Sequence, residues 1–107
     1  MNTYQEAQLE ALGDATRRGI LARLLAGPMP VGRLARDFPV SRPAISQHLR
    51  ILKDAKLVVD QPEGNRRIYR LNPQGFDSLR AHFDRFWTQA LDAFKQKAEQ
   101  RRPRRKR

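Results

Sequence analysis

Apolar residues recur every three or four positions through most of this chain, and this spacing predicts a largely helical protein. Residues typical of helix ends and helix starts separate the apolar segments, among them Gly13, Asp14 and the pair Gly27–Pro28. Pro30 stands where the third helix would carry a capping side chain. In chain order, the pattern predicts helices over residues 3–12, 15–27, 30–38, 41–54 and 73–100.

The segment between the fourth and fifth predicted helices follows a different pattern. β-Branched and aromatic residues fill the runs LVVDQ (57–61) and RRIYRL (66–71), and the PEGN between them consists of turn-forming residues. The two runs therefore predict a β-hairpin. Arg66 and Arg67 stand at its tip and directly after it, so the hairpin presents positive charge at one end.

The fourth predicted helix has two faces of different chemistry. Ser41 is a helix-capping residue, and Pro43 falls in the first turn, where a missing amide hydrogen costs no intrahelical bond. The apolar face consists of Ala44, Ile45, Leu49, Ile51 and Leu52, and the polar remainder includes Arg42, Ser46, Gln47, Arg50 and Lys53. A polar helix face is usually just solvated, but short hydrogen-bonding side chains interleaved with cations suit polar edges set among phosphates.

The last predicted helix carries an aromatic stripe that is large for so small a domain. Its apolar positions fall within an arc of roughly 140°, and they are Phe76, Leu79, Phe83, Phe86, Trp87, Ala90, Leu91 and Phe94. Such a stripe can be plain core, but one edge helix of a small domain has too little facing surface to bury it. We therefore expect a second copy of the chain to cover the stripe.

Length and charge narrow the classes of function. A chain of 107 residues forms one domain, placed at 1–100, and the closing cations of 101–107 are expected to be disordered. The net charge of +11 favours a polyanionic partner, with nucleic acid first and an anionic membrane surface second. The polar start and the lack of an apolar run of about 20 residues argue against a signal peptide and a membrane span, so we expect a cytoplasmic protein.

Four helices, a hairpin with an arginine-bearing tip and a long closing helix form the order of a winged helix-turn-helix, a mainly α fold with a β-hairpin wing. Three stretches carry a closer likeness: ALGDATRRGILARLLAG, SRPAISQHLRILKDAKLV and EGNRRIYRLNP. They resemble the ArsR/SmtB family of bacterial transcriptional regulators. The resemblance implies repression of a promoter, often the protein's own, by a homodimer that binds double-stranded DNA at an inverted repeat.

The resemblance also implies which residues form the dimer. The family dimerises through its first and last helices, with two recognition helices in successive major grooves. The expected interface residues are Leu9, Leu12, Phe76, Leu79, Phe83, Phe86, Trp87, Ala90 and Phe94.

Three departures from the family pattern change what is expected of this chain. Metal-sensing members have a cysteine motif in the third helix, where this chain reads VGRLARDF, or Asp and His pairs along the last helix, where only His82 stands near Asp77 and Asp84. We therefore expect no metal and no other cofactor. Lys56 replaces a glycine that is common in relatives, and a left-handed backbone there would carry a modest steric cost.

The polar face of the fourth helix and the hairpin tip supply the expected DNA contacts. Gln47 suits an adenine edge, Arg50 suits guanine or phosphate, and Ser46 suits either class of partner. The complete expected set is Ser41, Arg42, Pro43, Ser46, Gln47, His48, Arg50, Lys53, Arg66 and Arg67. His48 also falls near the middle of the apolar arc, where a packed core role is an equal alternative.

Other interpretations remain open at this point. Arg17 and Arg18 are expected to be structural and to pair with acidic neighbours, with phosphate contact as the second interpretation. The basic protein is alternatively an architectural nucleic-acid-binding protein without sequence preference, or a repressor that responds to an organic ligand. An enzyme is not expected, because the chain has no cysteine, no glycine-rich phosphate loop and only two histidines, on different elements.

Overall fold

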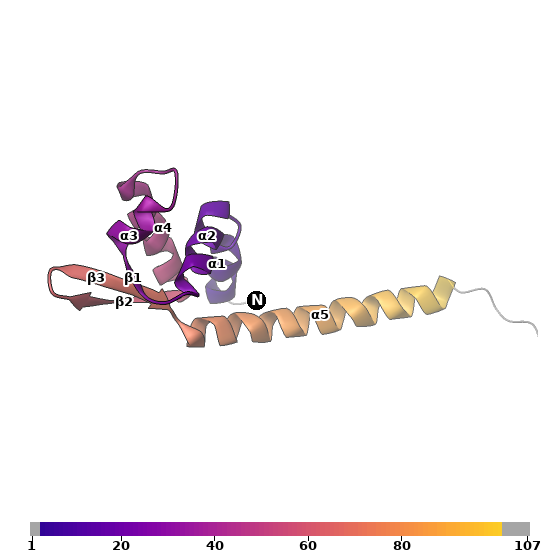
Figure 1. Ribbon diagram of the computed structural model, residues 1–107. Coiled ribbons are helices and arrows are strands. Elements are labelled where there is room, and N and C mark those ends of the chain that lie inside the picture. The colour runs from indigo at the N-terminus through magenta and orange to yellow at the C-terminus, as the bar shows by residue number, and fades with distance from the viewer. Residues whose placement is uncertain (1–2, 102–107) are drawn as a thin grey trace, which may run out of the picture.

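The computed structural model describes residues 3–101, which form five helices and a three-stranded sheet (Figure 1). In order, the elements are α1 (Thr3–Ala11), α2 (Ala15–Leu24), β1 (Met29–Pro30), α3 (Val31–Arg36), α4 (Arg42–Asp54), β2 (Val58–Glu63), β3 (Arg66–Leu71) and α5 (Pro73–Arg101). The expected basic tail lies outside the described residues from position 102 onward, and α5 includes Arg101.

Short polar side chains define where two of the helices begin. The Asp14 carboxylate accepts a hydrogen bond from the backbone amide of Arg17 at 3.0 Å and caps α2. The Ser41 hydroxyl accepts from the backbone amide of Ala44 at 3.2 Å and caps α4. Both caps confirm the sequence predictions. Pro30 precedes α3 without any side-chain cap, as the sequence also indicated.

The sheet has one strand that the sequence pattern did not predict. Its order is β1–β3–β2 with antiparallel neighbours, and β1 pairs Met29 with Tyr69. Two residues are too few to show a periodicity, so β1 becomes visible only through its distant partner strand. The β2–β3 hairpin closes through Gly64 and the residue after it, a shorter turn than the predicted PEGN. Gly64 has φ +65°, which suits the first central position of such a turn.

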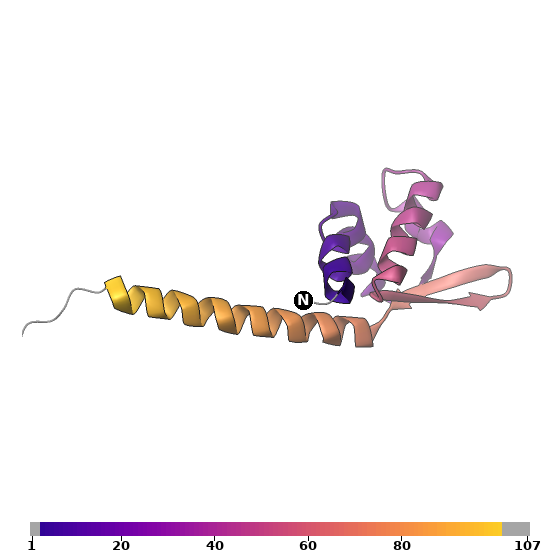
Figure 2. The same ribbon diagram turned by 180° about the vertical axis from the view of Figure 1, so that it is seen from behind.

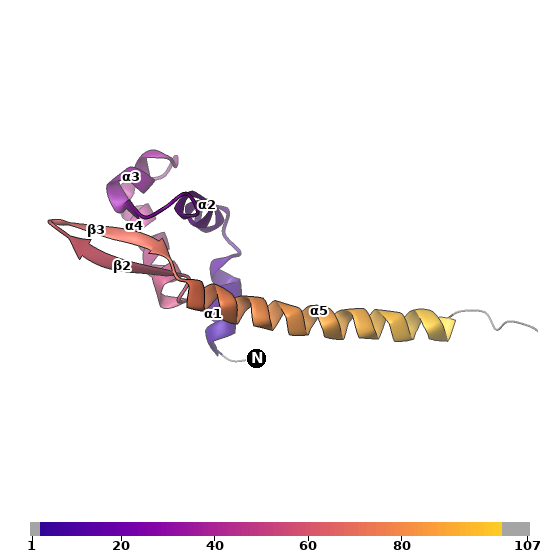
Figure 3. The same cartoon turned by 60° about the horizontal axis from the view of Figure 1, so that its bottom comes forward.

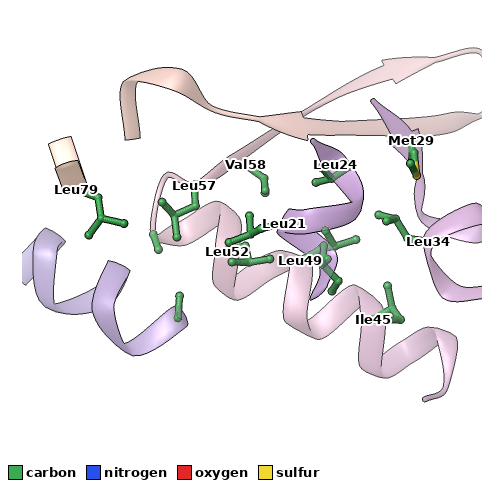
Figure 4. Packing of buried hydrophobic residues seen from close by; sticks show 13 residues of the cluster. Leu21, Leu24, Met29, Leu34, Ile45, Leu49, Leu52, Leu57, Val58 and Leu79 are labelled. Atoms are coloured by element: carbon green, nitrogen blue, oxygen red, sulfur yellow. The ribbon is translucent and has the colours of Figure 1, made fainter. Parts of the chain in front are cut away.

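One apolar cluster, drawn in Figure 4, holds the helices and the sheet together, and α4 runs through its middle. Ile45, Leu49 and Leu52 on the predicted apolar face of α4 are fully buried. The remaining buried members come from every other element except β3, and they are Ala11, Ile20, Leu21, Leu24, Met29, Leu34, Ala55, Leu57, Val58 and Leu79. Because the core takes one side of α4, its polar side faces outward.

The end of α4 is formed by a left-handed residue. Lys56 has φ +64°, as its replacement of a glycine suggested. The amide of Leu57 donates to the carbonyl of Leu52 at 2.9 Å, and the amide of Lys56 donates to that of Lys53 at 2.9 Å. This pair of bonds is the Schellman pattern, and the burial of both leucines adds the apolar contact that accompanies it.

The start of α5 packs directly against this helix end. The Asn72 side chain donates to the Lys56 carbonyl at 2.9 Å and accepts from the amide of Gln74 at 3.2 Å. A Cβ at Gly75 would lie 1.7 Å from the Lys56 carbonyl oxygen, so only glycine allows this approach. The buried Gln8 side chain of α1 donates to the Gly75 carbonyl at 3.1 Å. Helices α1, α4 and α5 therefore meet at one point.

Beyond that point α5 projects away from the other elements (Figures 1 and 2), and the whole molecule, α5 included, measures 77 × 26 × 24 Å. We call residues 3–79 the body and residues 80–101 the arm. Figure 3 shows α1 crossing α5 near its start, before the arm begins. Leu79 belongs to the core of the single chain, so it is not free for the dimer face where it was expected. The exposed large apolar residues of the arm are Phe83, Phe86, Trp87, Leu91 and Phe94.

Candidate nucleic-acid interface

The outward side of α4 presents a row of polar side chains. Ser46, Gln47, Arg50 and Lys53 are all exposed, and together with Pro43, Asp54 and Tyr69 they line one shallow hollow. The core contacts on the opposite side fix the rotation of α4 about its axis. The polar residues that the sequence assigned to base contact therefore lie together on one accessible surface.

Beside this hollow lies a groove rich in arginine. Arg42 at the start of α4 and Arg66 and Arg67 from the hairpin line it, as the sequence expectation of phosphate contacts requires. The groove is also lined by Arg33 and Arg36 of α3, which the sequence analysis did not select. Their spacing of three on a predicted helix was the available signal, and the structure leaves both side chains exposed. Tyr69 borders both the groove and the hollow, and these two concave surfaces are hereafter called the arginine groove and the α4 hollow.

A single carboxylate joins the two surfaces. The side chain of Asp60 in β2 is 6% exposed, and its carboxylate lies 2.9 Å from Nζ of Lys53 and 2.7 Å from Nε of Arg67. Burial raises the pKa of Asp60, but the hydrogen bonds and charges of Arg67 and Lys53 outweigh it, so that pKa lies below its usual value. The same contact with Asp60 raises the pKa of Arg67. The sequence analysis missed Asp60, because a lone acid in a hairpin is ordinarily a solvated surface residue.

The other arginine of the hairpin tip is held more loosely. Arg66 lies 3.5 Å from Glu63, and both side chains are well exposed. Exposed pairs of this kind contribute little to stability, so the Arg66 guanidinium is available to another anion. Farther along β3, Arg70 donates to the side chain of Gln61 on the neighbouring strand.

His48 lies apart from the other expected DNA-contacting residues. It is partly buried against α2, with Nδ1 3.3 Å from Nη1 of Arg17 and 3.9 Å from the Asp14 carboxylate. The backbone amide of Arg17 donates to Asp14 and lowers the pKa of that carboxyl, an effect that burial opposes and the nearby charge of His48 supports. His48 thus faces α2 and not the exposed polar side of α4, because it falls inside the apolar arc.

Arg17 and Arg18 at the start of α2 have the expected structural role, but their hydrogen bonds go to backbone carbonyls. Arg17 Nε donates to the carbonyl of Ala11 at 2.8 Å, and Arg18 Nη1 donates to the carbonyl of Leu12 at 2.8 Å. The expected pairing with acidic neighbours is wrong for Arg18, whose hydrogen bond goes to a backbone carbonyl, whereas the charge of Arg17 acts on Asp14 and lowers the pKa of that carboxyl. The last carbonyls of a helix lack intrahelical partners, and these guanidinium groups satisfy them at the end of α1.

The described part of the chain lacks two other kinds of feature. Across residues 3–101, no three His, Cys, Asp or Glu side chains gather in a way that could hold a metal ion. No helix within this range is both long and apolar enough to span a membrane.

Comparisons with known proteins assign the family. Residues 12–61 match a family model described as a helix-turn-helix domain. The HTH-type transcriptional regulator Rv2034 of Mycobacterium tuberculosis is 55% identical over 98 residues, which cover 90% of this chain and 92% of that protein. The arsenical resistance operon repressor of Staphylococcus xylosus is 33% identical over 84 residues, 77% of this chain and 81% of that one. This chain belongs to the ArsR family.

A solved structure agrees with that assignment. The crystal structure of a possible transcriptional regulator for arsenical resistance matches with a TM-score of 0.72 and 48% identity, over 85% of this chain and 95% of that chain. The protein is therefore an ArsR-family winged helix-turn-helix regulator of transcription, as its sequence predicted. In this ArsR-family fold α3 and α4 form the helix-turn-helix, and the β2–β3 hairpin is the wing.

Proposed function

We propose that this protein is a transcriptional repressor that binds an inverted repeat in double-stranded DNA as a homodimer and acts on its own promoter. The observation that carries the proposal is the side-by-side position of the α4 hollow and the arginine groove, which share Tyr69. A surface that reads bases needs hydrogen-bonding side chains flanked by cations that hold the backbone, and this pair of surfaces offers both. Such a repressor acts in the cytoplasm and blocks transcription by occupying the promoter.

The two surfaces divide the work of recognition. Gln47 and Ser46 in the first turns of α4 contact base edges in the major groove, with Arg50 contacting guanine or phosphate. Arg42 and the other arginine-groove side chains contact phosphates, and the wing arginines reach the backbone or the minor groove beside it. Ser41 has its hydroxyl engaged in the α4 cap, so its contact with phosphate would come through the helix start.

A second copy of the chain completes the site. Phe86, Trp87, Leu91 and Phe94 are more than half exposed in the single chain, and a partner arm would cover them. Leu9 of α1 and Leu12, which directly follows that helix, are only partly buried, and because α1 packs against α5 they extend that interface. A two-fold dimer presents two α4 helices, and these fit half-sites about one helical turn apart. No cofactor is needed for this function.

One experiment tests specificity, symmetry and autoregulation together. The protein is footprinted on the DNA upstream of its own gene, and a duplex is selected with it from a random-sequence pool. We expect a discrete protected region with two-fold symmetric half-sites. A continuous or shifting footprint, with no sequence recovered by selection, contradicts the repressor and supports an architectural protein without sequence preference.

A substitution in the α4 hollow tests whether Gln47 contributes to sequence specificity. Gln47→Ala should cost roughly 1–3 kcal/mol on the selected duplex and relax preference at one base position per half-site, with little change on a scrambled duplex. Gln89→Ala, an exposed glutamine in the arm, is the matched control and should change neither affinity. Equal weakening of both duplexes by Gln47→Ala would show that α4 does not read the sequence.

A further inference from the structure

Asp60 is a partly buried acid placed where a DNA-binding protein gains most from positive charge. Its side chain is 6% exposed, while the side chains of its two partners, Lys53 at 50% and Arg67 at 53%, remain half in solvent. Lys53 belongs to the last turn of α4 and Arg67 to β3, so the carboxylate links the recognition helix to the wing through β2.

Charge alone does not explain this residue. An acid between two cations repels phosphate and weakens the attraction that the rest of the basic surface creates. Burying a carboxylate is also costly unless hydrogen bonds compensate, and here two charged donors at 2.7 and 2.9 Å do so. The two bonds instead fix the positions of Lys53 and Arg67, because each one holds a long and otherwise flexible side chain in one place.

The position of Asp60 in the sheet extends this effect to the neighbouring surfaces. Its register partner on β3 is Tyr69, the residue that borders both the α4 hollow and the arginine groove. Lys53 lines the α4 hollow and Arg67 lines the arginine groove. The links from Asp60 therefore fix the relative placement of the base-reading surface and the phosphate-holding surface.

We propose that Asp60 is a positioning residue for DNA specificity, which holds Lys53 and Arg67 and thereby sets the wing against the recognition helix. This proposal rests on the proposed function, since it concerns how that same surface discriminates among sequences. Asp60 contacts no DNA itself in this proposal. It lowers the attraction for any DNA slightly and raises the preference for the correct sequence.

The test compares Asp60→Asn with a matched control in the same hairpin, Glu63→Gln, whose exposed partner Arg66 is 3.5 Å away. Each variant removes one negative charge from the wing. Affinities are measured for the duplex selected by the wild-type protein and for a scrambled duplex of the same composition. Asp60→Asn should lower the ratio of the two affinities about tenfold, with scrambled DNA bound equally or more tightly. Glu63→Gln should strengthen both alike and leave the ratio unchanged.

A second background shows whether Asp60 acts through its two partners. In a protein that already carries Lys53→Gln and Arg67→Gln, the further change Asp60→Asn should leave the affinity ratio unchanged. A residue needed only for folding would instead lower both affinities in both backgrounds. A full additional loss of discrimination in this background overturns the proposal.

The remaining outcomes separate this proposal from the proposed function. If the wild-type protein does not distinguish the two duplexes, the proposed function fails. If it does, and Asp60→Asn keeps the wild-type ratio, only the positioning role is overturned. Should circular dichroism show that Asp60→Asn is unfolded, Arg67→Lys replaces it, because this change keeps the charge and loses the guanidinium geometry. The ratio should then fall at unchanged affinity for scrambled DNA, and an unchanged ratio overturns the proposal.

Discussion

The body and the arm both carry helical patterns of apolar residues, but the body buries its apolar residues and the arm leaves them exposed. Leu49, at the centre of the body, is 0% exposed, whereas Leu91 in the arm is 59% exposed and Phe94 is 71% exposed. In the body, α4 is surrounded by other elements of the same chain, and in the arm α5 has passed beyond α1, the helix that covers its start (Figure 3). A periodic pattern thus predicts that a helix has an apolar side, but not which chain covers that side.

The largest expected effect on stability comes from replacing one leucine in the body and one in the arm by alanine. Leu49→Ala leaves a cavity in the packed core and should lower the free energy of unfolding by roughly 2–5 kcal/mol at every protein concentration. Leu91→Ala removes the same atoms from the arm and should lower stability only where the dimer forms. Urea denaturation at several protein concentrations measures both. A concentration-independent loss for Leu91→Ala would mean that the arm is covered by its own chain.

The next effect concerns the arm alone. Trp87→Glu should raise the dissociation constant of the dimer at least about a hundredfold, because a carboxylate would be buried in an apolar interface. Gln89→Glu adds the same charge on the opposite side of the helix and should leave dimerisation nearly unchanged. Sedimentation equilibrium gives both constants. Unchanged dimerisation of the Trp87 variant would contradict the interface.

A third prediction addresses the joint between the two regions. Gly75→Ala would place a methyl group 1.7 Å from the Lys56 carbonyl oxygen, so the backbone must shift, at a cost of about 1–3 kcal/mol of unfolding free energy. Gly32→Ala in α3 is the control, since no heavy atom lies within 4 Å of its added Cβ. It should leave stability unchanged or raise it, by up to about 1 kcal/mol, through helix propensity. Thermal unfolding of the two variants shows whether stability is lost only at Gly75, where the added methyl group clashes, or at any glycine replaced by alanine.

The smallest effect depends on pH. Because the pKa of Asp60 is lower in the folded protein than in the unfolded chain, its pairing stabilises the fold above about pH 4 and is lost as pH falls through the folded pKa. Asp60→Asn should therefore be less stable than wild type near neutral pH, with the difference vanishing in acid. Asp84→Asn in the arm, from an exposed pair 4.0 Å from Arg80, should change stability by less than about 0.5 kcal/mol at any pH. Urea midpoints across pH 2–7 measure how the stability difference between wild type and Asp60→Asn changes with pH. A difference that persists in acid contradicts the prediction.

Much of the fold was predictable because its signals are local. The Asp14 and Ser41 caps, the apolar side of α4 and the left-handed Lys56 each depend on a few neighbouring residues, and each is confirmed. Strand β1 was not predictable, since its two residues gain their identity from pairing with β3.

The residues of the candidate site also fall into those predictable from local sequence and those that depend on tertiary contacts. The polar side of α4 follows from helical periodicity alone, so its exposed residues could be chosen from the sequence. The role of Asp60 depends on three elements that meet only in the folded chain, and so does the meeting of Arg33 and Arg36 with the wing. Arg18 was misjudged for a related reason, because its partner is a backbone carbonyl rather than a charge.

The close approach of Gly75 to the Lys56 carbonyl has a consequence for the spacing of the operator. That contact and the Asn72 hydrogen bond hold the start of α5 directly against the end of α4. In the proposed dimer, the crossing angle of the two arms then determines the separation and tilt of the two recognition helices. Substitutions along the arms, far from any base, would change which half-site separation fits. In the proposed repressor, the geometry of the whole dimer therefore sets the spacing between half-sites, and α4 contacts the bases within each half-site.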